Sequence, residues 1–559
     1  MDIPATSLSI PVYEFIAHQL KQLGIQKVFG LMSEDTAQLV AVLDAIGIRF
    51  YSARHENTAI GMAEGHASST GQLSVALIGR GPATANGLHA ATYASRTGSR
   101  VLLLIGDAPL GRKPNGTGPD TKEFKSIDVL RAAGLSVFSP TSPAAMQMCL
   151  ADAASHANRG TTAILLLPVD IQKANVKVDT LDIQIDSARS DKASTSPRES
   201  ALNAAAELLS RAERPLILAG KGAWLAGAKQ ALEALSDRTG AILCTSLKAK
   251  DMFAEHPFHV GLAGSFSFSV GRRFYEQADC IIAFGAGLNQ RTTSYGKSFP
   301  SNVPVIQVDS NRDHIGKWFD ADVAIVGDAR EVAEQLLGRL PEPGARERGF
   351  HTAANRHLIA SFDRASDFTV ARTAQTMDPR ALGIELNRIM LKERRVAYDA
   401  GNFLGILPYI DVPSPRCLKN SSEFGSIGLG FSTAMGFAEG SRGIPTYLFI
   451  GDGGLLMTLG ELDTVAREGI PLVIFVMNDC AYGAETHFLQ QHDMPVAKSI
   501  FADIDFADVA AHFGIDTATV RSISDLAAIA DSIANPEGPI LIDCKINGRV
   551  AAAFTAEHP

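Results

Sequence analysis

Continuous apolar runs alternate with helically patterned stretches along most of the chain. In its first part, the helical spacing of apolar residues covers 12–23 and 85–98. Strands are expected at residues 27–30, 48–56 (which runs on into a helix), 74–82, 101–109 and 161–170. An apolar run without alternation is typical of a strand buried on both faces. Helices between such strands indicate a parallel sheet that is covered on both sides.

The same pattern continues in a second part, with strands expected at 215–220, 241–246, 280–287 and 304–310 and a closing segment at 327–340. The polar, serine-rich stretch 187–200 and the charged stretch 341–357 are expected to be linkers. We therefore predict an α/β protein with three doubly wound parallel-sheet domains, at residues 1–186, 200–340 and 370–559.

The most informative stretch of the third part is 446–483. It predicts a strand at Tyr447–Ile450, a Gly-Asp-Gly turn, a helix at Leu455–Glu468 and a second strand at Leu472–Met477, which ends in Asn478-Asp479. This order is a βαβ unit, so the turn and Asn478-Asp479 are expected at the carboxyl ends of two neighbouring parallel strands. Open α/β sheets bind ligands at that edge.

The residues at this edge suit a diphosphate and a magnesium ion. Gly451, Gly453 and Gly454 would let the backbone turn sharply and leave amide groups free at a helix N-terminus. Asp452 and Asp479, with a nearby carbonyl and two phosphate oxygens, would give Mg²⁺ a shell of hard oxygen ligands. The alternative is an ordinary turn in which the aspartate caps a helix.

Composition narrows the function classes. A chain of 559 residues is expected to hold about three domains. Its net charge of −9 comes without a basic tract, so no nucleic-acid partner is expected. The six cysteines form no CxxC pairs, which argues against zinc and against a disulfide scaffold. No apolar run is long enough to span a membrane and no basic leader opens the chain, so a cytoplasmic location is expected.

The 446–483 stretch resembles the cofactor motif of thiamine diphosphate enzymes, in which GDG is followed some two dozen residues later by Asn-Asn. The resembled family includes acetolactate synthase, pyruvate decarboxylase and benzoylformate decarboxylase. It implies thiamine diphosphate and Mg²⁺ as cofactors, with Asp452, Asp479 and Ala481 as metal ligands and with Gly453, Gly454 and Tyr482 beside the cofactor. The chain departs from the motif at Asp479, where the family has asparagine. The added charge lies close to a diphosphate.

The segment RHENTAIGMAEGHASSTG resembles the family's pyrimidine-binding domain and makes Glu56 its central residue. By itself, Glu56 could be a first-turn glutamate stabilised by the helix dipole. The resemblance instead implies that Glu56 binds N1′ of the aminopyrimidine and promotes formation of the reactive ylide. It also implies that Glu56 serves a cofactor held by a partner subunit. The expected assembly is therefore at least a homodimer, with a homotetramer favoured.

Two further segments carry cofactor candidates. In GSIG, the resemblance makes the Gly425 carbonyl an acceptor for the pyrimidine amino group and makes Ile427 the wedge that bends the cofactor; a glycine turn before a buried helix is the alternative. AYDAGNF lies where the family has a phosphate-side loop, so Gly401 and Asn402 are weaker candidates. The middle part has glycine turns at 220–224 and 284–291 but no full GxGxxG, so FAD is not expected.

The resemblance implies an acetolactate synthase-like enzyme that acts on a 2-oxo acid by decarboxylation, carboligation or both, through an enamine. A 2-hydroxyacyl-CoA lyase or diketone-cleaving enzyme on the same cofactor is the alternative, and a non-catalytic relative is disfavoured. Glu485 and Glu34 lie near positions of catalytic acids in decarboxylases and are proton-handling candidates. Each could equally be structural, Glu485 on a helix surface and Glu34 beside an N-cap.

No subfamily is matched cleanly. Residues 111–128 lack the paired histidines of decarboxylases. The Phe-Gln-Glu motif of the synthases reads Phe124-Lys125-Ser126 here, and their Ser-Gly-Pro-Gly begins with Arg80. Arg80 and Lys125, beside Phe124, could bind a substrate carboxylate, although solvated loop charges are the commoner case. Four histidines are further candidates of low weight, because a satisfied structural histidine is the usual case: His55, His66, His89 and His487.

Overall fold

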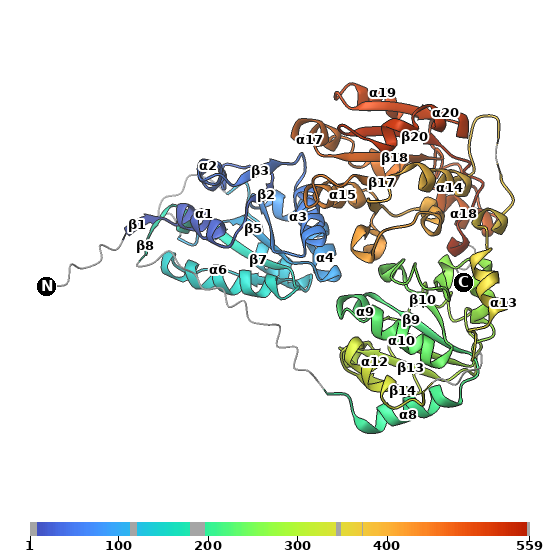
Figure 1. Cartoon of the computed structure of the whole chain (residues 1–559). Helices are drawn as coiled ribbons and strands as arrows, with labels where there is room; N and C mark the ends of the chain where they lie inside the picture. Colours follow the sequence, from blue (N-terminus) through green and yellow to red (C-terminus); the bar gives the residue numbers. More distant parts are fainter. Residues whose placement is uncertain (1–7, 112–119, 179–195, 343–347, 372, 556–559) are drawn as a thin grey trace.

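The computed structural model describes residues 8–111, 120–178, 196–342, 348–371 and 373–555. Three six-stranded parallel sheets follow one another along the chain, each flanked by helices (Figure 1). This confirms the predicted fold class. Within the described residues, no helix is both long enough and apolar enough to cross a membrane.

The first sheet has the strand order β3-β2-β4-β5-β7-β6. Its strands are β2 (Lys27–Gly30), β3 (Arg49–Ser52), β4 (Ser74–Ile78), β5 (Val101–Asp107), β6 (Ser136–Phe138) and β7 (Ala163–Pro168). Its helices are α1 (Val12–Gln22), α2 (Ala37–Ala45), α3 (Glu56–Thr70), α4 (Pro82–Thr97), α5 (Ser126–Ala132), α6 (Pro143–Asn158) and α7 (Val169–Lys173). A short antiparallel pair joins β1 (Leu8–Pro11) to β8 (Asn175–Val178).

The middle sheet has the order β11-β10-β9-β12-β13-β14, the strand order of a dinucleotide-binding fold. Its strands are β9 (Pro215–Ala219), β10 (Ile242–Thr245), β11 (His259–Leu262), β12 (Cys280–Phe284), β13 (Val305–Asp309) and β14 (Val323–Val326). Its helices are α8 (Glu199–Arg211), α9 (Lys221–Leu225), α10 (Lys229–Thr239), α11 (Ser269–Tyr275) and α12 (Ala329–Leu337), and α13 (Ala353–Ala360) follows.

The third sheet has the order β16-β15-β17-β18-β20-β19, which repeats the connectivity of the first. Its strands are β15 (Arg395–Tyr398), β16 (Leu418–Asn420), β17 (Thr446–Gly451), β18 (Leu472–Asn478), β19 (Asp516–Val520) and β20 (Ile540–Lys545). Its helices are α14 (Pro379–Ile389), α15 (Leu429–Glu439), α16 (Asp452–Leu456), α17 (Glu461–Glu468), α18 (Gly483–Gln491), α19 (Phe506–Ala511), α20 (Ile523–Ala528) and α21 (Ala530–Ala534).

Three sequence-based expectations need correction. The helix predicted at Leu455–Glu468 is split into α16 and α17, with Met457–Gly460 as a turn between them. The stretch predicted as a linker at 341–357 includes the start of α13. Of the other predicted linker, residues 187–195 lie outside the described residues, and α8 already begins at Glu199.

Helices α3 and α15 join the first and third parts of the chain and lie side by side in Figure 1. Their backbones meet at glycines. A Cβ atom on Gly65 would stand 1.9 Å from the Thr433 carbonyl oxygen, and one on Gly436 would stand 1.8 Å from that of Met62. Neither position has room for a side chain, so these glycines allow the two helices to approach closely.

Candidate cofactor site

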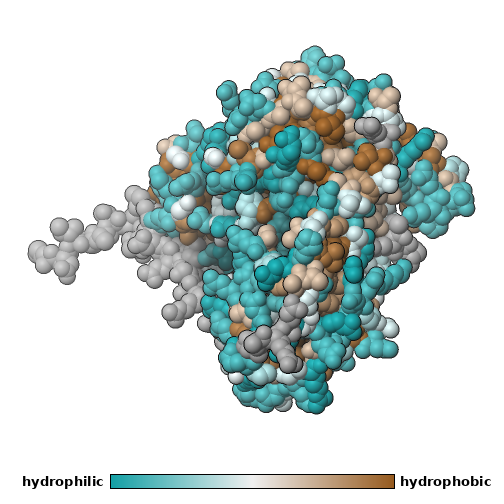
Figure 2. Space-filling model, turned by 45° about the vertical axis from the view of Figure 1, so that its right-hand side comes forward, coloured by the Kyte–Doolittle hydropathy of each residue, from teal (hydrophilic) through white to brown (hydrophobic). Residues whose placement is uncertain are grey.

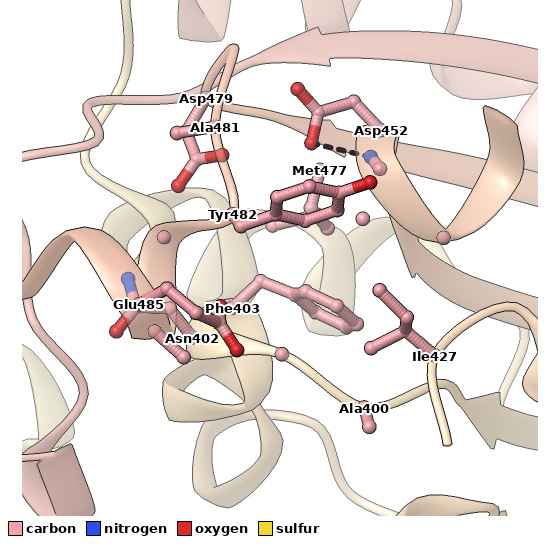
Figure 3. Close-up of a pocket in the computed structure, with 16 residues that line it drawn as sticks. Ala400, Asn402, Phe403, Ile427, Asp452, Met477, Asp479, Ala481, Tyr482 and Glu485 are labelled. Carbon is pink, nitrogen blue, oxygen red and sulfur yellow. Dashed lines mark hydrogen bonds between the residues drawn. The ribbon is translucent and has the colours of Figure 1, made fainter. Parts of the chain in front are cut away.

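The candidate site is a cleft at the carboxyl ends of β15, β17 and β18, enclosing about 390 Å³. The strand order reverses between β15 and β17, and ligands of open α/β sheets bind at such a reversal. Figure 3 shows both aspartates above the Tyr482 ring, with Glu485 and Ile427 at opposite ends of the cleft. Because β17 and β18 are neighbours, the predicted meeting of the GDG turn with Asp479 does occur.

Asp452 is the first residue of α16, and only 2% of its surface is exposed. Its Oδ1 accepts a hydrogen bond of 2.9 Å from the Gly453 amide, while its Oδ2 is buried with no partner among the described residues. Burial, reinforced by the charge of Asp479, raises the pKa of Asp452 to about 8. Burial likewise raises the pKa of Asp479 to about 7. A divalent metal would stabilise such a pair, the buried Asp452 carboxyl beside the partly buried one of Asp479.

The chemistry of these donors fits a magnesium ion bound together with a diphosphate. The described residues contain no group of three or more His, Cys, Asp or Glu that could hold a metal by itself. The chain can supply two carboxylates, from Asp452 and Asp479, and the backbone carbonyl of Ala481. Since Mg²⁺ prefers six oxygen ligands and is often shared with substrate phosphates, the remaining ligands would be phosphate oxygens and water.

One part of the role predicted for the glycines of the turn, a sharp backbone turn, needs correction. None of Gly451, Gly453 and Gly454 has a positive φ, so the backbone there needs no special conformation. Space is the constraint instead: a Cβ on Gly453 would lie 2.6 Å from the Tyr482 ring, and one on Gly454 would lie 2.4 Å from Oδ2 of Asp399. Side chains from two neighbouring segments therefore pack directly on this backbone.

Asp399 is a site residue that the sequence did not single out. It is fully buried, and its carboxylate accepts hydrogen bonds from the amides of Gly428 (2.7 Å) and Gly430 (3.0 Å). Burial raises the pKa of Asp399 to about 6, although these hydrogen bonds oppose the rise. Its place directly after an apolar strand and two residues before Gly401 was the available signal. Asp399 connects the start of α15 to the Gly454 backbone.

The other cofactor candidates of the third part surround the same cleft. Gly425 and Gly428 have φ of +68° and +83°, so the 425–428 loop makes a turn that favours glycine at both ends. Ile427 and Gly401 line the cleft. Asn402 does so as well, but its side-chain amide is engaged by Val550 and Ala552, which leaves its backbone for a ligand.

Glu56 is the first residue of α3 and is not among the residues that line this cleft. Its Oε2 accepts a hydrogen bond of 3.0 Å from the amide of Asn86 on α4, a partner that the sequence did not identify. The start of α3 nevertheless lies against the third part, because the Arg54 amide donates to the Glu461 carboxylate at 3.1 Å. The described chain thus holds Glu56 at the boundary between its first and third parts.

Of the remaining candidates, only Glu485 lines the cleft, and the others lie on loops of the first part. Glu485, on α18, lines the cleft. The Glu34 side chain is 76% exposed and pairs with Lys122 at 3.0 Å. Arg80 pairs with Asp35 at 2.9 Å and Asp120 at 2.5 Å. Phe124 is half-buried, Lys125 is exposed beside the start of α5, and neither lines the cleft.

The glycine turns of the middle part pack against each other. The Gly220 amide donates to the Phe284 carbonyl at 2.9 Å, and the Gly222 amide donates to the Gly285 carbonyl at 3.0 Å. A Cβ on Gly220 would stand 2.2 Å from the Gly285 carbonyl oxygen. This contact accounts for the glycines as packing residues. The expectation that the chain carries no FAD stays a prediction.

Comparison with known protein families identifies the family to which this site belongs. Residues 10–129, 202–336 and 399–544 match the N-terminal, central and C-terminal domains of thiamine pyrophosphate enzymes. Together the matches cover more than two thirds of the chain. The chain belongs to the thiamine pyrophosphate enzyme family. The predicted resemblance is therefore confirmed, and thiamine diphosphate (another name for the pyrophosphate) is the cofactor of its N- and C-terminal domains.

Relatives of this thiamine diphosphate enzyme differ in their reactions. A sulfoacetaldehyde acetyltransferase of Roseovarius nubinhibens is 27% identical, over 97% of this chain and 93% of its own length. An acetolactate synthase isozyme 1 large subunit of Escherichia coli is 26% identical, over 96% and 93%. A probable 2-ketoarginine decarboxylase of Pseudomonas aeruginosa is 28% identical, over 83% and 81%. The chain thus resembles a synthase, a transferase and a decarboxylase to similar extents.

Proposed function

We propose that this thiamine diphosphate enzyme requires Mg²⁺ and acts on a 2-oxo acid by decarboxylation, carboligation or both. The proposal draws on family membership and on relatives named acetolactate synthase and 2-ketoarginine decarboxylase. The single observation that carries it is the pair of aspartates in the cleft, Asp452 buried and Asp479 partly buried, with Oδ2 of Asp452 unpartnered among the described residues. A diphosphate-bound cation would satisfy that oxygen.

The residues have distinct parts in this proposal. Bound thiamine diphosphate supplies a nucleophilic carbon and an electron sink. Glu56, whose carboxylate is oriented by Asn86, would hold a proton at N1′ of a pyrimidine that the partner subunit binds. The Gly425 carbonyl would accept from the pyrimidine amino group, and Ile427, which lines the cleft, would support the cofactor. Glu485, at the edge of the cleft, is placed to move a proton to or from the substrate.

Glu34, Arg80, Phe124 and Lys125 do not line the cleft of their own chain, and neither does Glu56, so any contact of theirs with a substrate would be at the cleft of a partner subunit. Glu34 and Arg80 are also engaged in the ion pairs of the first part. They would reach a substrate only if a partner subunit brought a second cleft towards the loops that carry them. Such an arrangement would be tested together with the oligomeric state.

We expect a cytoplasmic assembly of at least two subunits, with a homotetramer favoured. Large apolar side chains of the third part are exposed: Leu456, Met457, Phe488, Met494 and Ile500. Figure 2 shows hydrophobic patches between hydrophilic residues, most of them in the upper half of that face. A second subunit would bury apolar surface of this kind. Sedimentation velocity with bound cofactor measures the assembly, and a monomer would contradict it.

The function is tested by measuring CO₂ and products from a panel of 2-oxo acids. The enzyme is loaded with thiamine diphosphate and Mg²⁺ and assayed with and without an acceptor aldehyde or a second 2-oxo acid. CO₂ release with an aldehyde, an acyloin or an acetohydroxy acid as product is the expected result, and the pattern names the substrate class.

A lack of CO₂ release would indicate that the enzyme breaks or forms a different kind of carbon–carbon bond. If cofactor is bound and no 2-oxo acid releases CO₂, the 2-oxo acid assignment is wrong. Cleavage of a 2-hydroxyacyl-CoA or a cyclic diketone by the same preparation would then define the activity. Absence of turnover with every substrate class would favour a non-catalytic relative.

A further inference from the structure

The 425–427 loop is held from the first part of the chain by one side chain. Nε2 of His89, on α4, lies 2.5 Å from Oγ of Ser426, which stands between Gly425 and Ile427. Within the described residues, this is the one side-chain hydrogen bond to that loop. The exit of the loop is fixed separately, because Asp399 accepts from the Gly428 amide at 2.7 Å.

His89 belongs to a stripe of α4 that faces the third part. One turn earlier on this stripe, Asn86 orients Glu56. Further along it, Tyr93 donates to the Asn420 carbonyl at 3.3 Å, and the Arg96 guanidinium lies 4.9 Å from the Phe424 ring centre. Residues three or four apart share one face of a helix. This face therefore holds both the Glu56 carboxylate and the segment that leads into the cofactor loop.

The loop has little support of its own. Gly425 is exposed, and Ser426 and Ile427 are only partly buried. Both glycines of the turn are in the left-handed region, and a Cβ on Gly425 would meet no atom within 4 Å. A loop of this kind samples several conformations unless a contact selects one. His89 supplies such a contact at the middle residue.

We propose that His89 is a positioning residue for the cofactor, which holds Ser426 so that the Gly425 carbonyl and the Ile427 side chain meet the pyrimidine in a fixed geometry. The inference rests on the proposed function, because it assigns the pyrimidine to this loop. His89 acts through Ser426 and is given no contact with the substrate. His89, a candidate of low weight in the sequence, is thereby given a role at the site.

The test compares cofactor binding in variants of the full-length enzyme with Mg²⁺ present. His89→Ala is expected to weaken thiamine diphosphate binding about five- to tenfold, the loss expected for one hydrogen bond. It should also alter the circular dichroism of the bound cofactor. His89→Gln, which keeps a group able to bond Oγ, should restore most of the affinity.

Tyr93→Phe is the matched control, because it removes another hydrogen bond between α4 and the third part without touching the loop. Its cofactor affinity should stay within about twofold of wild type. Equal losses in His89→Ala and Tyr93→Phe would overturn the proposal in favour of simple domain docking. Wild-type affinity and an unchanged spectrum in His89→Ala would also overturn it.

A double-mutant cycle with Ser426→Ala keeps the proposal testable if His89→Ala folds poorly. Ser426→Ala should reproduce the loss, and the double variant should be no weaker than either single variant, since both remove the same interaction. Additive losses would contradict the coupling. If wild-type enzyme itself failed to bind thiamine diphosphate, the proposed function would fail, which is distinguishable from failure of the His89 assignment.

Discussion

Glu56 has one identified partner in the described chain, the Asn86 amide, and the start of its helix lies beside the third part. This arrangement keeps the carboxylate oriented without a competing cation. The proposed role depends on the acid itself, since glutamine can form hydrogen bonds but cannot exchange a proton with N1′.

We predict that Glu56→Gln lowers kcat by at least about 100-fold, the usual range for losing a positioned acid or base. Thiamine diphosphate should still bind, because the diphosphate and metal contacts belong to the other end of the cofactor. Turnover with 2-oxo acid and a cofactor titration measure the two effects on one preparation. Retained turnover would remove Glu56 from the mechanism.

The environment of His66 predicts that acid lowers the stability of the fold. Its ring lies 5.4 Å from Phe29, and its Nδ1 is buried without a hydrogen-bond partner among the described residues. Burial, assisted by the charge of Lys27, lowers the pKa of His66 from 6.5 to about 4. Between pH 6.5 and pH 4, His66 therefore binds a proton in the unfolded chain but stays neutral in the native state. The stability contributed by His66 is present above pH 6.5 and is lost as the pH falls towards 4.

The expected consequence is that His66→Leu loses less stability than wild type between pH 7 and pH 5, by about 2 kcal/mol. Urea unfolding at the two pH values measures the difference. His357→Leu, at an exposed position, serves as the control and should follow wild type. An identical pH dependence in His66→Leu and wild type would show that His66 titrates normally in the fold.

Site residues could be predicted from the sequence where the order of neighbouring elements along the chain already brings them together. Asp452 and Asp479 follow two strands that are consecutive in a βαβ unit, so their proximity follows from the pattern. Asn86 and Asp399 were missed because each acts on a residue some 30 positions away, Asn86 on Glu56 and Asp399 on Gly428. The packing role of Gly453 and Gly454 was missed because it depends on contacts with Tyr482 and Asp399, which the local sequence does not reveal.

At the scale of elements, the contact between α3 and α15 is built from small residues. Besides Gly65 and Gly436, Gly61 faces Ser432, whose Cβ would lie 2.6 Å from an added methyl group. A side chain at these positions would push apart two helices that connect different parts of the chain.

Gly65→Ala is accordingly expected to destabilise the protein by about 3 kcal/mol or more, the upper range for overpacking, because the new Cβ meets backbone rather than a flexible side chain. Thermal denaturation provides the measurement. Gly460→Ala is the matched control: its φ is −61° and an added Cβ would meet no atom within 4 Å. If both variants melt alike, the close contact between α3 and α15 does not exist in solution.

The strands were easier to predict than the helices. Apolar runs located β2, β9 and β18 to within a residue or so, because a strand covered on both faces must be apolar throughout. Short strands such as β6 and β14 were missed, since three or four residues at a sheet edge give little pattern. The break between α16 and α17 was also missed, because the amphipathic pattern continues across the turn.

At the scale of the whole molecule, the first and third sheets share one strand order and the middle sheet has another. The two similar parts face each other through α3 and α15, and a buried network reinforces that boundary. Glu439 accepts from Tyr51 at 2.6 Å and pairs with Lys27 at 3.2 Å and with Arg442 at 2.6 Å. Pairing with these cations holds the pKa of Glu439 below its ordinary value despite burial. The proposed site thus lies beside a boundary that is packed and charge-compensated.

In the proposed site, the cleft binds thiamine diphosphate through a cation held by Asp452. Isothermal titration of the enzyme with thiamine diphosphate, once with Mg²⁺ and once with a chelator, measures whether binding needs this cation. Wild-type enzyme should bind only when Mg²⁺ is present, Asp516→Ala at an exposed position should behave as wild type, and Asp452→Ala should show no metal-dependent binding. Wild-type affinity in Asp452→Ala, or binding that is indifferent to Mg²⁺, would contradict the account.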